Sequence, residues 1–215
     1  MAEVEYVPAA GRYRWADTKR FVGRQTLLNL VDQESQRLKV RLQGVTRLLV
    51  DNRIDLAEWQ NRFAEEIKAS HLRIGILAGG GQDQMNAQKY GATGYQIRRQ
   101  FEYLSNFAND IAGGNMRPSQ ILRRAGLYSE SINSTFNRVE QITRADEGFT
   151  EALRSLDSQA QHCNSCISYS TRGKWLPAEQ VVPPAINCEC QARCRCTIKY
   201  RKRPTNLNRP GILAS

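Results

Sequence analysis

The first 162 of the 215 residues contain no cysteine, and histidine occurs only at His71 and His162, 91 residues apart. No G-x-S-x-G, H-E-x-x-H or P-loop motif occurs, and the glycine-rich stretches at 79–81 and 113–114 are not followed by Lys-Ser/Thr. A lone histidine beside an apolar stripe, such as His71, is typical of a packed or surface residue rather than a ligand. We therefore expect that the protein is not an enzyme.

Long apolar segments are also missing. No run approaches the roughly 20 residues that a membrane-spanning helix needs, and residues 1–15 lack the apolar stretch of a secretory signal. Hydrophobic residues still make up 40% of the chain and charged residues 24%, which is enough apolar material for a core. The sequence predicts a folded protein with no membrane partner, in a reducing cytosol.

The net charge is +10, and it is unevenly distributed. Residues 151–215 contain ten Lys or Arg but only four acidic residues. A basic end favours contact with a polyanion, either nucleic acid or an acidic protein surface, although these cations would also balance the charge of a metal bound by thiolates. The candidate nucleic-acid or partner-binding residues are Arg193, Arg195, Lys199, Arg201, Lys202 and Arg203.

The spacing of apolar residues predicts a mainly α fold, with a helical body of about four long helices and a small C-terminal cysteine-rich zinc module containing short β-strands. Residues 1–24 are expected to form an extended arm or hairpin, irregular up to residue 11 and turning at Asp17. The helical domain should span residues 25–148, the zinc-binding module 149–200 and a basic tail 201–215.

Helix signals mark the boundaries within the helical domain. Asp55 followed by Glu58 resembles a capping box, and the glycines at 79–81 end the helix that starts there. Residues 82–94 are polar and glycine-punctuated, which predicts a loop with a short helix before the third long helix. The fourth helix should open at Pro118 and present its apolar face through Ile142. The expected core residues include Trp59, Phe63, Ile67, Ile74, Leu77, Leu104, Phe107, Ile121, Ala125, Tyr128, Ile132, Phe136 and Val139.

All six cysteines fall within 34 residues, as one C-x-x-C pair followed by two C-x-C pairs. Four thiolates satisfy tetrahedral Zn²⁺, so the cluster predicts a closed structural zinc site. We expect Cys163 and Cys166 to supply two ligands. Two of the last four cysteines supply the others, either one from each C-x-C pair or Cys190 with Cys194. The candidate metal ligands are Cys163, Cys166, Cys188, Cys190, Cys194 and Cys196, with His162 as an additional candidate.

Other uses of the cysteines stay open at this point. The two thiols left over would be free, form a disulfide or belong to a second site. An iron–sulfur cluster also takes four cysteines, and a disulfide knot would need an oxidising compartment. A redox C-x-x-C pair is the enzymatic alternative, but it expects a βαβ context that the helical pattern does not provide.

The order of these motifs resembles a known family. Cys163 and Cys166 are followed by Gly173 and Trp175, then by Pro183-Pro184 and a final C-R-C, an arrangement similar to the C-terminal end of the phage head-morphogenesis proteins, the minor head proteins like phage Mu protein F. The helical segment from Phe101 to Tyr128 is also similar, though more loosely. The likeness covers about residues 50–200.

The resemblance implies a structural virion protein that is made in the host cytoplasm and built into the particle in few or multiple copies. Its partners would be the portal, capsid or connector, and packaged DNA. Cys163, Cys166, Cys194 and Cys196 match the family ending. The usual histidine before the final C-R-C is absent, so the resemblance implies Cys188 or Cys190 as a replacement ligand. The alternative function is a zinc-containing nucleic-acid-binding protein that uses the basic C-terminal end.

Overall fold

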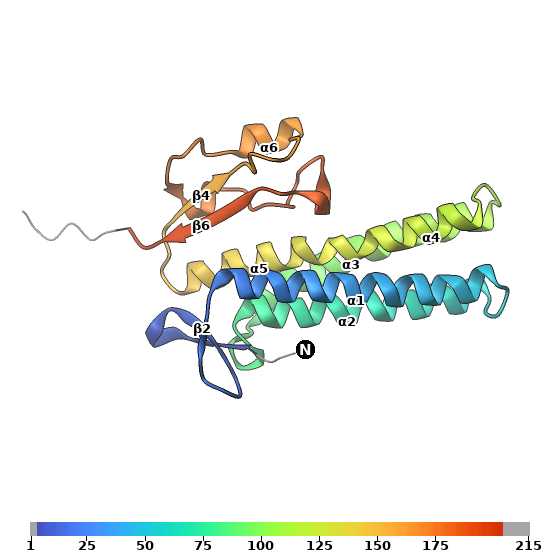
Figure 1. Cartoon of the computed structure of the whole chain (residues 1–215), viewed down its shortest axis with the longest axis horizontal. Helices are drawn as coiled ribbons and strands as arrows, with labels where there is room; N and C mark the ends of the chain where they lie inside the picture. The colour runs from blue at the N-terminus through green and yellow to red at the C-terminus, as the bar shows by residue number, and fades with distance from the viewer. Residues whose placement is uncertain (1–3, 204–215) are drawn as a thin grey trace, which may run out of the picture.

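A computed structural model describes residues 4–203, and the fold is mainly α with a small cysteine-rich unit at its C-terminal end. Figure 1 shows the long helices side by side in an elongated bundle, with the C-terminal unit lying over α5. The main helices are α1 (Arg24–Val50), α2 (Leu56–Gly79), α3 (Ala87–Ala112), α4 (Pro118–Leu127) and α5 (Ile132–Asp146). One short α-helix, α6 (Asn164–Tyr169), lies in the C-terminal unit.

The start of α2 is as predicted, and its cause is local. The Asp55 side chain accepts a hydrogen bond from the Glu58 backbone N–H at 2.7 Å and so caps the helix. The reciprocal half of a capping box does not form, because the Glu58 carboxylate pairs with Arg62. Gly80, with φ of 96°, ends the helix in the left-handed conformation.

Two helix boundaries differ from the predicted ones. The segment 82–94, expected as a loop with a short helix, is part of the long helix α3 from Ala87 onward, capped by the Asn86 side chain. The expected fourth helix is divided into α4 and α5 by the 3-10 turn η3 (Tyr128–Ser131). Within that turn the Ser131 hydroxyl donates to the Tyr128 carbonyl oxygen at 2.6 Å, and such side-chain bonds compete with regular helix geometry.

The bundle core is built around four aromatic rings from the two helices α2 and α3 and the turn η3. Trp59 lies 5.1 Å from Phe63 and 5.2 Å from Phe107 between ring centroids, and Phe63 lies 5.1 Å from Tyr128. All four side chains are buried, as the apolar stripes predicted. Each fully buried apolar side chain contributes roughly 1.5–3 kcal/mol to stability. Within residues 4–203, no helix is long and apolar enough to cross a membrane.

Two polar residues buried in the bundle, His71 and Glu34, are hydrogen-bonded. His71 is fully buried, and its two ring nitrogens lie 2.6 Å from the Thr135 hydroxyl and 3.0 Å from the Ser131 hydroxyl. Glu34, also buried, accepts hydrogen bonds from Arg41 and Arg73, both at 2.9 Å or less. His71 is therefore a packed core residue, and both of its ring nitrogens are hydrogen-bonded to hydroxyls, one from η3 and one from α5.

The N-terminal segment forms a three-stranded antiparallel sheet at one end of the bundle (Figure 1). The strands are β1 (Val4–Val7), β2 (Arg12–Trp15) and β3 (Phe21–Val22), with the 3-10 turn η1 (Pro8–Ala10) between the first two. The hairpin of β2 and β3 agrees with the predicted one. The expectation of irregular structure before residue 11 is wrong, because β1 pairs with β2 and the Tyr6 N–H donates to the Gly80 carbonyl oxygen at 2.8 Å.

The C-terminal unit has a second three-stranded sheet, in the order β5-β4-β6. Its strands are β4 (Glu151–Ser155), β5 (Leu176–Pro177) and β6 (Thr197–Arg201), and the 3-10 turns η4 (Ala178–Gln180) and η5 (Gln191–Arg193) lie between β5 and β6. The predicted module boundary at residue 200 falls within β6, which runs to Arg201 because Arg201 pairs with Glu151 of β4. The rest of the predicted tail from residue 204 onward lies outside the described residues.

Candidate metal centre

Two loops bring the cysteines together. The first runs from β4 to α6, where Cys163 is the N-cap residue and its sulfur accepts from the Cys166 N–H at 3.4 Å. The second precedes β6 and bends sharply at Ala185, Asn187 and Gln191, which have φ of 62°, 52° and 48°. Left-handed backbone at non-glycine residues is uncommon and reverses the chain direction. These bends fold the second loop over the first.

Four thiol sulfurs form the tightest group. Those of Cys166, Cys188, Cys190 and Cys194 all lie within 4.8 Å of one another, and the Cys166 sulfur is 3.5 Å from each of the sulfurs of Cys190 and Cys194. Ligand bonds of about 2.3 Å place the sulfurs of a tetrahedral zinc site roughly 3.8 Å apart. The four cysteines are therefore close enough to hold a metal ion, and their thiol donors suit a thiophilic one.

Cys163 and Cys196 lie beside this group rather than in it. Of the expected pair Cys163 and Cys166, the structure brings Cys166 into the four-sulfur group, whereas the Cys163 sulfur lies outside it and accepts from the Cys166 N–H. Both outer cysteines still belong to the same cluster of side chains, and all six cysteines are free thiols. Desolvation raises the pKa of Cys163, but N–H donors from Cys166 and Cys190 outweigh it and bring that pKa to about 7.

An arginine that the sequence reading did not single out lies inside the cluster. Arg154 on β4 is fully buried, and its Nη2 atom lies 3.1 Å from the Cys188 sulfur, 3.5 Å from that of Cys166 and 3.6 Å from that of Cys194. Its Nη1 atom donates to the Val182 carbonyl oxygen at 2.8 Å. Burial lowers the pKa of Arg154, but hydrogen bonds to Cys188 and Cys196 outweigh it, so the guanidinium stays charged.

The role of Arg154 had one signal in the sequence. Residues 149–156 alternate loosely, which predicts a strand, and Arg154 shares the inward face of that strand with Ala152. A fully buried arginine requires anionic or hydrogen-bonding partners. Thiolates are the anions that this cluster offers.

The apolar core of the C-terminal unit is small. It comprises Ala152, Ala178, Val181 and Ile198, with Tyr200 packed against it. A core of this size supplies little of the free energy needed to order some fifty residues. The cysteine cluster is the unit's second buried centre, and a bound metal would add its binding energy to folding.

The unit is also fixed to the helical body. Gln141 on α5 donates to the Ala178 and Val181 carbonyl oxygens at 3.2 and 3.1 Å, and the Ser134 hydroxyl donates to the Ala185 carbonyl oxygen at 2.9 Å. These bonds hold the second cysteine loop against α5. The four-cysteine group therefore lies close to the bundle surface.

The six basic candidate residues are exposed, but they do not form one cluster. Arg193 lies 3.8 Å from Glu130 of the bundle, and Arg195 lines the hollow beside α1 and α5. Arg201 is engaged with Glu151 at 2.6 Å and with the Trp175 ring. Lys199 points to the same side of β6 as Arg201. The Lys202 ammonium lies over the Phe149 ring, and the Arg203 backbone N–H donates to the Thr150 hydroxyl.

Comparison with known proteins identifies no relative. No family model, no curated protein and no solved structure matches the chain.

Proposed function

We propose that the protein is a non-enzymatic structural protein whose C-terminal unit is held together by one structural zinc ion. The proximity of the four sulfurs of Cys166, Cys188, Cys190 and Cys194 carries this proposal. A site with four thiolate ligands has no open coordination position for a substrate, unlike a catalytic zinc site with three protein ligands and water.

Zinc accounts for this geometry better than an iron–sulfur cluster or a disulfide knot. Sulfurs within 4.8 Å of one another surround a single ion and leave little room for several iron and sulfide atoms. A disulfide requires a sulfur–sulfur distance of about 2.05 Å, whereas the Cys166 and Cys190 sulfurs are 3.5 Å apart.

We further propose that the protein is a minor head, portal-associated, connector or capsid-stabilising component of a tailed-phage virion. The support for this role is the order of the cysteine, glycine, tryptophan and proline motifs from Cys163 to Cys196, which is similar to the end of the head-morphogenesis proteins. The long helical bundle would pack on neighbouring subunits, and the zinc unit would form a rigid contact on its side.

Particle composition tests the virion role. Purified phage particles should contain the chain in a fixed proportion to the major capsid protein, and a high-salt wash should not remove it. If the chain is abundant in the infected cell but missing from the particles, the virion role is wrong while the zinc centre is unaffected.

The alternative, nucleic-acid binding through the basic C-terminal end, is supported by the exposure of Lys199 and Arg195. It predicts binding that weakens steeply with salt and that is lost when these two residues are changed to alanine.

A further inference from the structure

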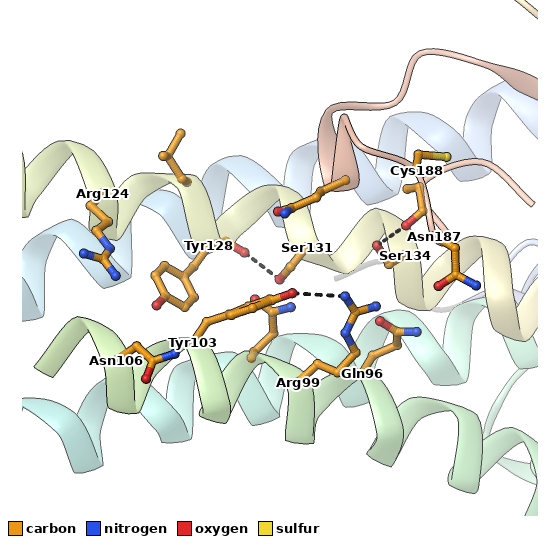
Figure 2. Close-up of a pocket in the computed structure, with 14 residues that line it drawn as sticks. Gln96, Arg99, Tyr103, Asn106, Arg124, Tyr128, Ser131, Ser134, Asn187 and Cys188 are labelled. Atoms are coloured by element: carbon orange, nitrogen blue, oxygen red, sulfur yellow. Dashed lines mark hydrogen bonds between the residues drawn. The ribbon is translucent and has the colours of Figure 1, made fainter. Parts of the chain in front are cut away.

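A groove runs along α3 beneath the second cysteine loop. It consists of two adjoining cavities of about 320 and 400 Å³, which share Gln96, Arg99 and Asn187 in their walls. Figure 2 shows the side chains that line the cavity of about 320 Å³, with Arg99 and Tyr103 on α3 opposite Tyr128 and Ser131, and with Asn187 and Cys188 of the loop to one side. We refer to the two cavities together as the α3 groove.

The charged residues in the walls of the α3 groove are all arginines, Arg99, Arg124 and Arg138, of which Arg124 pairs with Asp110 outside the groove. Among residues 4–203, neither cavity has an Asp or Glu in its wall. The chain has 21 acidic residues, and three other hollows on its surface are each lined by at least two of them. Arg99 donates to the Tyr103 hydroxyl at 3.0 Å and Arg138 to the Gln141 amide oxygen at 2.8 Å. Both bonds are to neutral partners, so neither positive charge is balanced there.

Exposed aromatic rings accompany these cations. Tyr95 and Tyr103 on α3 are 49% and 38% exposed. Eight residues apart, they lie on one face of the helix and roughly 12 Å from each other. The guanidinium of Arg98 lies 5.4 Å from the Tyr95 ring centre, and that of Arg99 lies 5.9 Å from the Tyr103 ring centre.

We propose that the α3 groove binds single-stranded nucleic acid. Arginines without carboxylate partners attract phosphates, and exposed tyrosines beside them offer rings on which successive bases stack. The amides of Gln96 and Asn187 are placed to hydrogen-bond base edges. A duplex fits this arrangement poorly, because its bases are already stacked on one another and are not free to stack on the tyrosine rings.

This site goes beyond the structural role proposed above and does not depend on it. It is also separate from the basic C-terminal end, since none of Arg193, Arg195, Lys199 or Arg201 to Arg203 lines either cavity. Charge removal at the two places therefore distinguishes the two modes of nucleic-acid binding.

The test is fluorescence anisotropy with a labelled oligothymidylate about a dozen nucleotides long, using the metal-containing full chain. The Arg99→Ala/Arg138→Ala double variant should weaken binding at least about tenfold and reduce the slope of log K against log salt by roughly 1.4. The Tyr95→Ala/Tyr103→Ala double variant, which removes two stacking rings, should weaken binding by roughly 30-fold or more. Circular dichroism and metal content of each variant should match the wild type.

Two controls remove the same charge elsewhere. Arg37→Ala/Arg47→Ala changes two exposed arginines of α1, and Lys199→Ala/Lys202→Ala changes the basic end. Both should bind within about twofold of the wild type, apart from the weak effect of overall charge. The proposal is overturned if no saturable binding occurs, if the α1 variant loses as much affinity as the groove variant, or if a duplex of the same length binds more tightly. Loss only in the basic-end variant would instead support the alternative function.

Discussion

The Nη2 atom of Arg154 lies 3.1 Å from the Cys188 sulfur in the interior of the C-terminal unit. Zn²⁺ with four thiolates carries a formal charge of −2, and a buried excess charge is costly unless an opposite charge is near. In the proposed zinc site the fully buried guanidinium would supply that charge, and it donates hydrogen bonds to the sulfurs. We therefore propose that Arg154 supports this site without binding the metal.

Replacing Arg154 should therefore lower metal affinity. We expect Arg154→Met, which keeps much of the side-chain volume, to weaken zinc binding about 10- to 100-fold, the usual effect of losing a group that orients or polarises a ligand. Competition with a chromophoric chelator measures this. Arg172→Ala, which removes an exposed arginine from the same unit, is the control and should leave the affinity unchanged. Equal affinities for Arg154→Met and the wild type would contradict the role.

Stability should depend on pH through His71. Burial lowers the pKa of His71 from 6.5 to about 3, so the unfolded chain binds a proton that the folded chain rejects. Stability from this group is complete above pH 6.5 and falls as the pH decreases toward 3. Between pH 7.5 and 5.5 the loss should be about 1.4 kcal/mol. Desolvation raises the pKa of the buried Glu34, but hydrogen bonds from Arg73, Ser70 and Arg41 outweigh it and lower this pKa below 4.5. Glu34 therefore titrates below the window from pH 7.5 to 5.5.

Urea unfolding at the two pH values measures this effect. Zinc binding by thiols also weakens in acid, so the informative quantity is the difference in unfolding free energy between the wild type and His71→Gln. That difference should shrink by about 1.4 kcal/mol on going from pH 7.5 to 5.5. His162→Gln retains His71 and should follow the wild type. A difference that is independent of pH would mean that His71 is accessible to protons in the folded state.

Two glycines should respond oppositely to alanine. At Gly80 the backbone φ is +96°, and an added Cβ would lie 2.7 Å from the Tyr6 Cβ, so Gly80→Ala should destabilise the junction of α2 with the N-terminal sheet by more than about 1 kcal/mol. At Gly44, inside α1, nothing lies within 4 Å, and Gly44→Ala should stabilise by roughly 0.5–1 kcal/mol. Thermal unfolding compares them, and a stabilised Gly80→Ala would show that this turn is not strained.

The features that sequence predicts well are those with local causes. The Asp55 cap depends on one side chain and an N–H three residues away. The early start of α3 combines a local cap, Asn86, with distant partners that no local pattern reveals. Lys89 is buried and donates to the Gly79 carbonyl oxygen, and Thr93 packs where Gly75 has no side chain. Polarity in that segment predicts a loop, whereas the partners from α2 favour a helix.

The same distinction applies to the metal centre. The cysteine spacing predicts a metal site, because several thiols in a short segment can bind the same metal ion. The spacing does not indicate which four sulfurs lie closest together. Their arrangement depends on the left-handed turns at Asn187 and Gln191 and on the position of Cys163 as a helix cap. Arg154 joins the cluster through pairing of β4 with β6, a contact that no local pattern reveals.

Metal content measured by elemental mass spectrometry tests the central claim most directly. The purified wild-type chain should contain one zinc per molecule, Cys163→Ser should keep it, and Cys190→Ser should lose both the zinc and the ordered C-terminal unit. Iron in place of zinc, a chain that binds no metal, or full zinc retention in Cys190→Ser would contradict the assignment of the four closest thiols as a structural zinc site.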